Sequence, residues 1–415
     1  MVPNGWKKGI IEDISSVSSG GTPSRKKDSY WTGGNIPWVT TTEVKFGVIT
    51  NTVQKITQAG LDNSSAKLFP KDTILIAMYG QGKTRGQVAR LGIEAATNQA
   101  CAALQLNVGC DTEYYYQYLM SQYKNIRELA NSGGQENLSG GIIKGIHIPI
   151  PPYVEQQKIA KILVVWDKAI STTERLIDNR KQQKKALMQQ LLTGKKRLLD
   201  DSGKPFGAEW EEKLINEAFG VGSSKRVLQS DWCESGVPFF RTRELVSLAK
   251  REPFGSEIFI SEELFSKIEK KYGLPSKGDF LVSGVGTLGI IYQVKQDDKF
   301  YFKDGNVLWF KSNGTVDSTF FKYCFQSTHI QSQIKNQTTI TTVGTYTITN
   351  AKKTSFLCPP SITEQQKIAS VLLSSDKEIM LLENQLSDFK QEKKSLMQQL
   401  LTGKLRVHID KGEAA

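Results

Sequence analysis

The amino-acid sequence predicts an α+β protein: two β-rich mixed α/β domains, separated by two long helices that pack as an antiparallel coiled coil. Three observations support this fold class. The segments 155–197 and 364–406 align without a gap at a constant offset of 209, and 25 of their 43 positions are identical. Apolar residues recur in both at alternating spacings of three and four, which is typical of a helical seam. Each segment follows a longer stretch of short β-prone runs broken by Gly, Ser and Asn.

Both repeated segments are predicted to be continuous helices. Each follows a proline pair, Pro151-Pro152 or Pro359-Pro360, which holds the entering chain extended. Gly194 and Gly403 are natural C-terminal stops. Two similar apolar stripes in one chain most simply pack against each other, antiparallel if a pseudo-two-fold axis relates the halves. The expected boundaries are two globular domains at 1–150 and 209–358, and two helical segments at 151–208 and 359–415.

The stretches before the helices are also duplicated, but faintly. Trp31, Pro37, Thr41 and Glu43 recur at an offset of 201 as Trp232, Pro238, Thr242 and Glu244. The globular parts have therefore diverged while the helices have not, which favours two different targets and two copies of one partner. Packing explains a repeated apolar seam but not repeated polar residues, and these are the candidate partner-binding residues: Gln189, Gln190, Thr193, Gln398, Gln399 and Thr402. Recent recombination between the helical segments is the alternative explanation.

Composition favours a polyanionic partner. The 415 residues suit two to four units of ordinary domain size and carry a net charge of +12, with a pI near 9.2. The positive excess is spread over the first three segments and is densest in 151–208. A soluble protein that is merely basic is the alternative. No apolar run approaches the roughly 18 residues of a membrane helix. The five scattered cysteines fit neither a disulfide framework nor a zinc site, and we expect a cytoplasmic location.

Two glycine-rich fragments imitate nucleotide-binding motifs. Residues 77–84 fit a relaxed P-loop, and residues 284–289 match the dinucleotide fingerprint G-x-G-x-x-G. Both motifs require a helix to follow, whereas β-prone runs follow here, at 87–91 and 290–294. The two fragments also occupy corresponding places in the two halves. We interpret them as one duplicated β-hairpin.

Nothing in the sequence indicates a catalytic centre. Ile150-Pro-Pro-Tyr153 is like the Asn/Asp-Pro-Pro-Tyr motif of adenine-N6 methyltransferases, but Ile150 cannot bind the target amino group. The second copy begins at Cys358 and is equally unsuitable. The three histidines have no Cys or His at ligand spacing, and His147 is expected on the surface of an alternating strand.

These features together resemble the specificity subunits of type I restriction–modification systems over essentially the whole chain. The matching features are two variable globular units, each followed by a repeated helix. The matching sequence segments are GGTPS at 20–24, Tyr30-Trp31, Ile36-Pro37-Trp38, LIAMYG at 75–80, EAATNQA at 94–100, the proline pairs, EQQKIA and LLTGK. The second unit lacks the GGTPS and EAATNQA segments, so fewer sequence matches define the positions of its loops.

The resemblance implies a non-catalytic, DNA-reading subunit. Each globular unit would be a target-recognition domain for one half of a bipartite, asymmetric site in double-stranded DNA. The helix pair would set the unread gap and dock two methyltransferase subunits, which would carry S-adenosylmethionine and flip and methylate adenine. Nuclease–translocase subunits using ATP and Mg²⁺ would join for cleavage. This chain itself would hold no cofactor and no metal.

Candidate DNA-binding residues are cations and planar polar side chains in predicted loops. They are Arg25, Lys26, Lys27, Tyr79, Gln81, Lys83, Arg85 and Arg90 in the first unit, and Lys225, Arg226, Arg241, Arg243 and Thr287 in the second. We hypothesise that Arg85 and Arg243 include base readers. A coiled-coil scaffold without a DNA-reading role is the alternative function, and it predicts no salt-dependent DNA binding.

Overall fold

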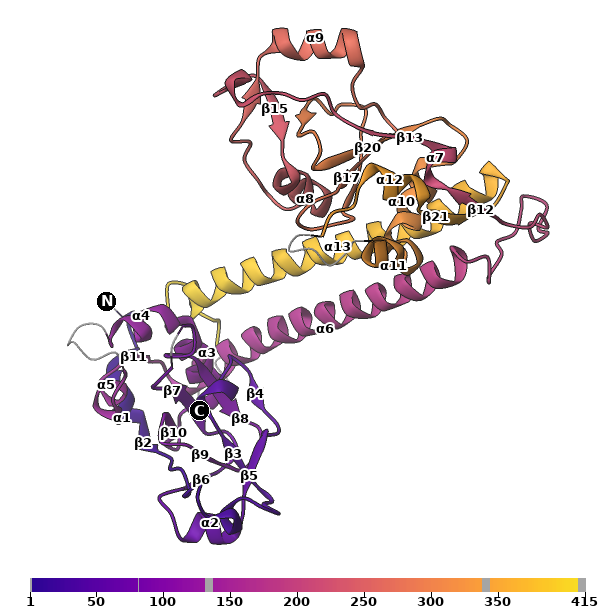
Figure 1. Cartoon of the computed structure of the whole chain (residues 1–415). Helices are drawn as coiled ribbons and strands as arrows, with labels where there is room; N and C mark the ends of the chain where they lie inside the picture. Colours follow the sequence, from indigo (N-terminus) through magenta and orange to yellow (C-terminus); the bar gives the residue numbers. More distant parts are fainter. Residues whose placement is uncertain (1, 81, 131–136, 338–343, 410–415) are drawn as a thin grey trace. The chain divides into compact units, whose positions relative to one another are not determined.

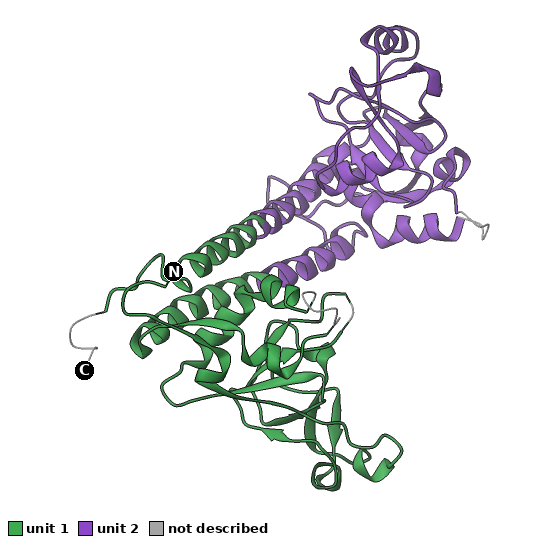
Figure 2. Ribbon diagram, turned by 90° about the vertical axis from the view of Figure 1, so that its left-hand side faces the viewer, with its two compact units in different colours: residues 1–175, 384–415 green, residues 176–383 purple. Residues whose placement is uncertain are grey.

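The computed structural model describes residues 2–80, 82–130, 137–337 and 344–409 (Figure 1). The chain divides into two compact units (Figure 2): unit 1 is Met1–Arg175 with Asn384–Ala415, and unit 2 is Leu176–Glu383. The long helices α6 (Tyr153–Leu191) and α13 (Ile362–Leu400) each contribute one segment to each unit. Each unit is therefore built from one globular domain and from both copies of the repeat.

The globular domain of unit 1 precedes α6. Its main sheet has the strand order β2-β10-β7-β8-β4, a second sheet has the order β5-β3-β9-β6, and β1 pairs with β11. Its elements are β1 (Lys7–Ile10), α1 (Ile11–Ile14), β2 (Ser15–Ser19), η1 (Asp28–Tyr30), β3 (Ile36–Val39), η2 (Thr41–Glu43), β4 (Val48–Ile49), β5 (Gln54–Ile56), α2 (Gln58–Asp62), β6 (Leu68–Phe69), β7 (Ile74–Ala77), β8 (Val88–Leu91), β9 (Ala95–Thr97), β10 (Cys101–Leu106), α3 (Thr112–Ser121), α4 (Tyr123–Glu128), α5 (Gly140–Lys144) and β11 (His147–Ile150).

The globular domain of unit 2 lies between α6 and α13. Its main sheet has the order β13-β20-β17-β18, a second sheet has the order β14-β16-β15-β19, and β12 pairs with β21. Its elements are β12 (Glu211–Leu214), α7 (Ile215–Ala218), β13 (Phe219–Ser223), η3 (Gln229–Asp231), β14 (Trp232–Cys233), β15 (Val237–Phe240), α8 (Thr242–Lys250), β16 (Phe259–Ile260), α9 (Glu262–Tyr272), β17 (Phe280–Ser283), β18 (Ile291–Gln293), β19 (Tyr301–Phe302), β20 (Val307–Ser312), α10 (Ser318–Gln326), α11 (Thr328–Gln337), α12 (Ile348–Lys353) and β21 (Ser355–Cys358).

The two domains repeat one arrangement of strands. The central run β2-β10-β7-β8 corresponds to β13-β20-β17-β18, and the pairings within both runs are antiparallel. Both glycine-rich fragments connect antiparallel strands, β7 to β8 and β17 to β18. The predicted duplicated hairpin is therefore confirmed, and neither fragment opens the helix that phosphate binding would need. His147 lies exposed on β11, also as predicted.

The apolar stripe of the repeat packs largely on the globular domains. In unit 1, Ile159 and Leu163 of α6 join a core that contains Tyr114 and Tyr115 of α3, together with Leu400 at the end of α13. The corresponding Ile368 and Leu372 of α13 join the core of unit 2. Further along α6, Ile177 is buried at 5% exposure, whereas its neighbour Leu176 is 44% exposed. Periodicity identifies an apolar face but not the element that covers it.

Within each unit, the segments of α6 and α13 run antiparallel. In unit 1, Asp167 meets Lys393 at 2.6 Å, and Glu174, further along α6, meets the earlier Lys390 at 2.7 Å. The rings of Trp166 and Phe389 make an edge contact at 5.7 Å. In unit 2, Lys184 meets Asp376 at 2.5 Å. Residue numbers fall on one helix as they rise on the other, as antiparallel packing requires.

Two guanidinium–carboxylate pairs close the ends of the helix segments. In unit 2, Arg197 Nε and Nη2 donate to the two oxygens of Glu364 at 2.7 and 2.9 Å. In unit 1, Arg406 binds Glu155 in the same way, and Trp6 Nε1 also donates to Glu155 at 3.0 Å. Both carboxylates are buried, Glu364 at 1% and Glu155 at 3% exposure. Each pair joins one copy of the repeat to the other at reciprocal positions.

We expect Arg197→Ala to lower the free energy of unfolding of unit 2 by about 3–5 kcal/mol, because Glu364 would remain buried without its cation. Arg180→Ala is the matched control, since Arg180 and Glu378 form an exposed pair that contributes about 1 kcal/mol or less. Denaturant titration of the full chain measures both. Addition of Glu364→Gln should recover part of the loss, whereas equal losses in the two arginine variants would contradict the assignment.

Candidate nucleic-acid interface

The hairpin joining β7 to β8 carries several of the predicted DNA-binding residues of unit 1. Tyr79 is 42% exposed, Lys83 is exposed and Arg85 is half-buried. The backbone carbonyl of Lys83 accepts a hydrogen bond from the Tyr123 hydroxyl at 2.7 Å, which ties the hairpin to α4. Gln81 lies outside the described residues. In unit 2, Thr287 occupies the corresponding hairpin and is exposed. Both hairpins therefore present polar side chains to solvent.

Arg90 differs from the hairpin residues because its charge is already balanced. It lies on β8, where Nη1 approaches Glu113 at 3.0 Å and Asp72 at 3.8 Å, with 26% of its side chain exposed. A cation held between two carboxylates presents little net charge to a phosphate. Arg90 is the predicted residue that the geometry favours least.

The 25–27 segment places exposed cations beside two aromatic rings. The Arg25 guanidinium stacks 3.7 Å from the Trp31 ring centre, and Nη2 donates to Gln54 Oε1 at 2.7 Å. Lys27 Nζ lies 4.9 Å from the Tyr30 ring centre, and Lys26 is exposed. Stacking orients the Arg25 side chain while leaving it at the surface. The cluster combines positive charge with planar groups, the combination that DNA contacts use.

Lys225 and Arg226 are both exposed, and Lys225 lines a hollow of about 580 Å³ in unit 2. The Lys225 backbone N–H donates to the Tyr301 hydroxyl at 2.8 Å, and its Nζ lies 5.2 Å from the Tyr272 ring centre. Lys311, 3.8 Å from the Trp309 ring centre, lines the same hollow. Lys311 is absent from the predicted set because it lies within a strand, where sequence patterns indicate no loop.

Arg241 and Arg243 form a hydrogen-bonded network with two glutamates. Arg241 Nη2 donates to Glu244 Oε1 at 2.6 Å, and Arg243 Nη2 donates to the same oxygen at 3.0 Å. Arg243 Nη2 also reaches Glu257 at 2.8 Å. Glu244 is 2% exposed, whereas the side chains of Arg243 and Glu257 are each 64% exposed. The buried carboxylate anchors the guanidinium groups at the surface.

This network lowers the pKa of both carboxyl groups. Burial alone would raise the pKa of Glu244, but hydrogen bonds from Arg241 outweigh it and hold that pKa below its usual value. Hydrogen bonds from Arg243 and then Arg241 lower the pKa of Glu257. Both carboxylates therefore stay charged at neutral pH, and the arginines stay in place.

The predicted partner-binding residues lie at matching positions in the two units. Gln189, Gln190 and Thr193 are exposed where α6 ends, and the Thr193 hydroxyl donates to the Gln189 carbonyl at 2.6 Å. Gln398, Gln399 and Thr402 are exposed where α13 ends, and the Thr402 hydroxyl donates to the Gln398 carbonyl at 2.6 Å. The duplicated sequence thus presents the same polar surface twice.

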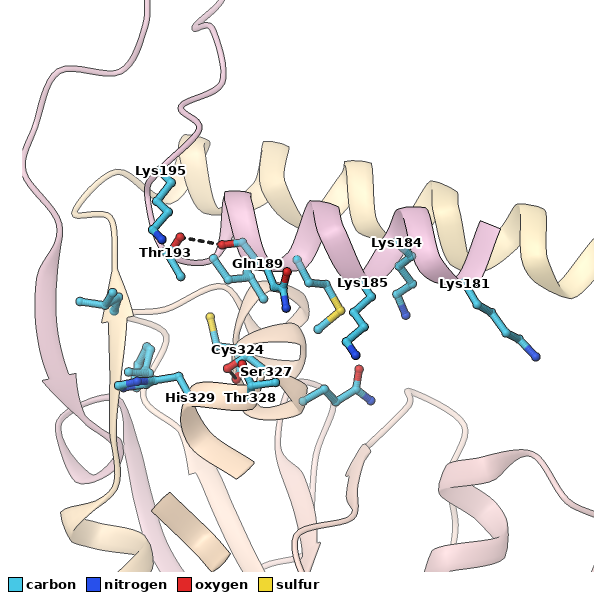
Figure 3. Close-up of a pocket in the computed structure, with 15 residues that line it drawn as sticks. Lys181, Lys184, Lys185, Gln189, Thr193, Lys195, Cys324, Ser327, Thr328 and His329 are labelled. Carbon is cyan, nitrogen blue, oxygen red and sulfur yellow. Dashed lines mark hydrogen bonds between the residues drawn. The ribbon is translucent and has the colours of Figure 1, made fainter. Parts of the chain in front are cut away.

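A groove of about 540 Å³ adjoins this surface in unit 2. Figure 3 shows Lys185, Gln189 and Thr193 on the helix side, facing Ser327, Thr328 and His329 on the domain side. In unit 1, Thr402 lines a hollow of about 500 Å³ with Leu401, Gln122 and His147. Leu401 and Thr402 correspond to Leu192 and Thr193, which line the groove of unit 2.

Within the described ranges, no group of three His, Cys, Asp or Glu side chains is arranged to hold a metal ion. No described helix is both long enough and apolar enough to span a membrane. Cys101 and Cys358 are reduced, and burial raises their pKa values to about 12 and about 11.

The comparison with protein families is decisive. The family model of the type I restriction modification DNA specificity domain matches residues 3–180 and again residues 207–388. The chain belongs to this family. The resemblance inferred from the repeats and motifs is confirmed, and the specificity domain occurs twice, once in each half of the chain.

Curated relatives match over nearly the whole specificity chain. It is 26% identical to the type I restriction enzyme MjaIX specificity subunit of Methanocaldococcus jannaschii, with 98% of this chain and 95% of that protein covered. It is 25% identical to the MjaVIII specificity subunit of the same organism, covering 98% of this chain and 94% of that protein.

Solved structures share the fold. A type I restriction–modification S subunit from M. genitalium aligns with a TM-score of 0.57 and 17% identity, over 96% of both chains. A chain from an assembly of the type I R-M system aligns with a TM-score of 0.60 and 14% identity, over 98% of this chain and 100% of that one. The mixed α/β architecture predicted for the specificity chain is therefore confirmed.

We expect the carboxyl groups of Glu244 and Glu257 to titrate below about pH 4.3, the ordinary range of glutamate. The stability that they contribute is fully present above that pH and is lost as the pH falls through their lowered folded-state pKa values. Carboxyl-carbon NMR of selectively labelled protein measures both. In Arg243→Ala, the pKa of Glu257 should move back up, and an unchanged value would contradict the proposed pairing.

Proposed function

We propose that this chain is the sequence-reading subunit of a type I restriction–modification complex. Each unit reads one half of a bipartite, asymmetric site in double-stranded DNA. The observation that carries the proposal is one specificity domain used twice on a common strand framework, with different polar side chains at the surface. Identical domains would read one sequence twice, whereas diverged domains read two. The exposed cations of both units supply the phosphate contacts that position a duplex.

The chain contributes recognition and leaves the chemistry to its partners. Its two identical helix ends dock two methyltransferase subunits, which carry S-adenosylmethionine and methylate an adenine lifted out of the duplex. Nuclease–translocase subunits that use ATP and Mg²⁺ join the same complex for cleavage. The free cysteines are in keeping with assembly in the cytoplasm.

The test is N6-methyladenine mapping by long-read sequencing. A methylation-free host expresses the cognate methyltransferase subunit with or without this chain. We expect a gapped, two-part motif only when the chain is present. Absence of methylation, with the two proteins shown to associate, would favour the scaffold function over DNA reading.

The docking surface predicts a stoichiometry. Thr402→Arg places a bulky charge at one helix end, and we expect the chain to bind one methyltransferase subunit in place of two. Thr193→Arg should do the same at the other end, and the double variant should bind none. Mass photometry of the purified complexes measures this. Loss of both subunits in either single variant would contradict two equivalent docking sites.

The pair of helices also acts as a spacer, as a pseudo-two-fold coiled coil would. Four residues inserted after Arg175 and after its repeat counterpart Asn384 lengthen both helices by about 6 Å, close to two base pairs. We expect a longer unread gap between two unaltered half-sites in the methylation map. Insertion into α6 alone is the control, because it breaks the register of the paired helices. A change in the half-sites themselves would contradict the spacer role.

A further inference from the structure

Each unit contains a pair of parallel strands that end side by side, β3 with β9 in unit 1 and β15 with β19 in unit 2. In unit 1 the Asn98 backbone N–H, just after β9, donates to the Val39 carbonyl at the end of β3 at 3.0 Å. In unit 2 the Lys303 backbone N–H, just after β19, donates to the Phe240 carbonyl at the end of β15 at 2.8 Å. Open sheets bind ligands at the carboxyl ends of such strands. Asn98 and Lys303 therefore occupy equivalent positions.

The turn that follows β3 or β15 is also equivalent in the two units. Glu43 accepts a hydrogen bond from the Thr40 backbone N–H at 2.8 Å. Glu244 accepts one from the Arg241 backbone N–H at 3.0 Å. This is the glutamate half of a capping box, which fixes how the next residues leave the strand. Thr42, in the short η2, and Arg243, in the first turn of α8, thus hold the same position after the strand.

The side chains at this strand end differ in chemical class between the two units. Unit 1 presents neutral hydrogen-bonding groups, from Thr40, Thr42 and Asn98. Unit 2 presents three cations at the matching positions, Arg241, Arg243 and Lys303. A purely structural turn would tolerate many residue types, but conversion of all three positions from neutral to basic changes what the strand end can bind.

In unit 2 the strand end borders a crevice of about 310 Å³, which is lined by Trp232, Arg241, Thr242, Arg243, Lys303 and Asn306. Trp232 Nε1 and Thr242 Oγ1 are buried atoms that lack a hydrogen-bond partner within the described part of the chain. Unused hydrogen-bonding capacity beside a cluster of cations is costly in an apolar core but useful at a binding surface.

We propose that this strand end is the base-reading site of each unit, and that Arg243 reads guanine in the half-site of unit 2. The inference rests on the proposed DNA-reading function. Arginine recognises guanine by donating two hydrogen bonds to O6 and N7 in the major groove. Arg243 has the geometry for this role, because its inner side is held by buried Glu244 and its outer part is exposed. Lys303 adds a second donor in the same crevice.

Arg241 and the two glutamates are positioning residues in this scheme. Glu244 holds both guanidinium groups from below, so Arg243 loses little side-chain freedom when it binds. Glu257 accepts a hydrogen bond from Arg243 Nη2 at 2.8 Å. A guanine edge that binds Arg243 must displace the Glu257 carboxylate. A phosphate must displace it too and is, in addition, repelled by the negative charge of Glu257. Glu257 thereby favours base contacts over backbone contacts.

The test exchanges the matched residues between the units. Arg243→Thr and Lys303→Asn give unit 2 the residues of unit 1, and Thr42→Arg gives unit 1 an arginine. Arg243→Thr leaves Arg241 paired with Glu244, so that the buried carboxylate keeps a cation. Each variant is expressed with the methyltransferase subunit in a methylation-free host, and N6-methyladenine is mapped genome-wide. Lys267→Thr is the charge-matched control, because Lys267 is exposed on α9 and pairs with Glu263.

We expect Arg243→Thr to relax one guanine position in one half-site, with discrimination there reduced about 10- to 100-fold, and the other half-site unchanged. Thr42→Arg should alter only that other half-site, and Lys267→Thr should alter neither. Uniformly weaker methylation of an unchanged motif would overturn the proposal by making Arg243 a phosphate contact. If Arg243→Thr fails to fold, an unchanged methylation motif in the Thr42→Arg variant is by itself enough to overturn the proposal. Failure of the wild-type chain to direct any methylation would instead refute the underlying function.

Discussion

The two buried pairs of an arginine with a glutamate, Arg406 with Glu155 and Arg197 with Glu364, underlie the rest of the architecture. Each guanidinium belongs to one copy of the repeat and each carboxylate to the other. The buried glutamate of each copy of the repeat is therefore paired with an arginine of the other copy and not of its own. Because an unpaired buried carboxylate is costly, each unit must contain the end of one repeat and the start of the other. This exchange explains why the compact units do not coincide with contiguous halves of the chain.

The globular domains separate framework from surface. Both domains use the same central strand order and the same glycine-rich hairpin. In both, the glutamate of a capping box orients the turn after a parallel strand. With the backbone held by these shared features, exposed side chains can change without loss of the fold. Under the proposed function, that separation lets each domain read its own half-site on a common framework.

The cations that the structure describes fall into two groups, those paired with carboxylates and those that are not. Arg90 is held by Glu113 and Asp72, and Arg243 is held by Glu244 and Glu257. Arg25 instead lies against an aromatic ring and hydrogen-bonds to an amide, and Lys26 is exposed. Cations held by carboxylates have a fixed direction but a reduced field, whereas the others contribute to long-range attraction. Attraction to DNA and selection among its sequences can thus reside in different residues.

The sequence by itself determined the family, the two long helices, the duplicated hairpin and the repeated polar surface, because these depend on local periodicity and on identity between the copies. The match of Glu43 in unit 1 with Glu244 in unit 2 was also visible as an offset of 201. Only the tertiary structure decided which residues share a site. In unit 2, Lys303 is far along the chain from Arg241, and the parallel pairing of β15 with β19 brings the two together. In unit 1, the pairing of β3 with β9 does the same for Asn98 and Thr40. Strand pairing is a long-range choice, governed by packing and register, that local patterns do not specify.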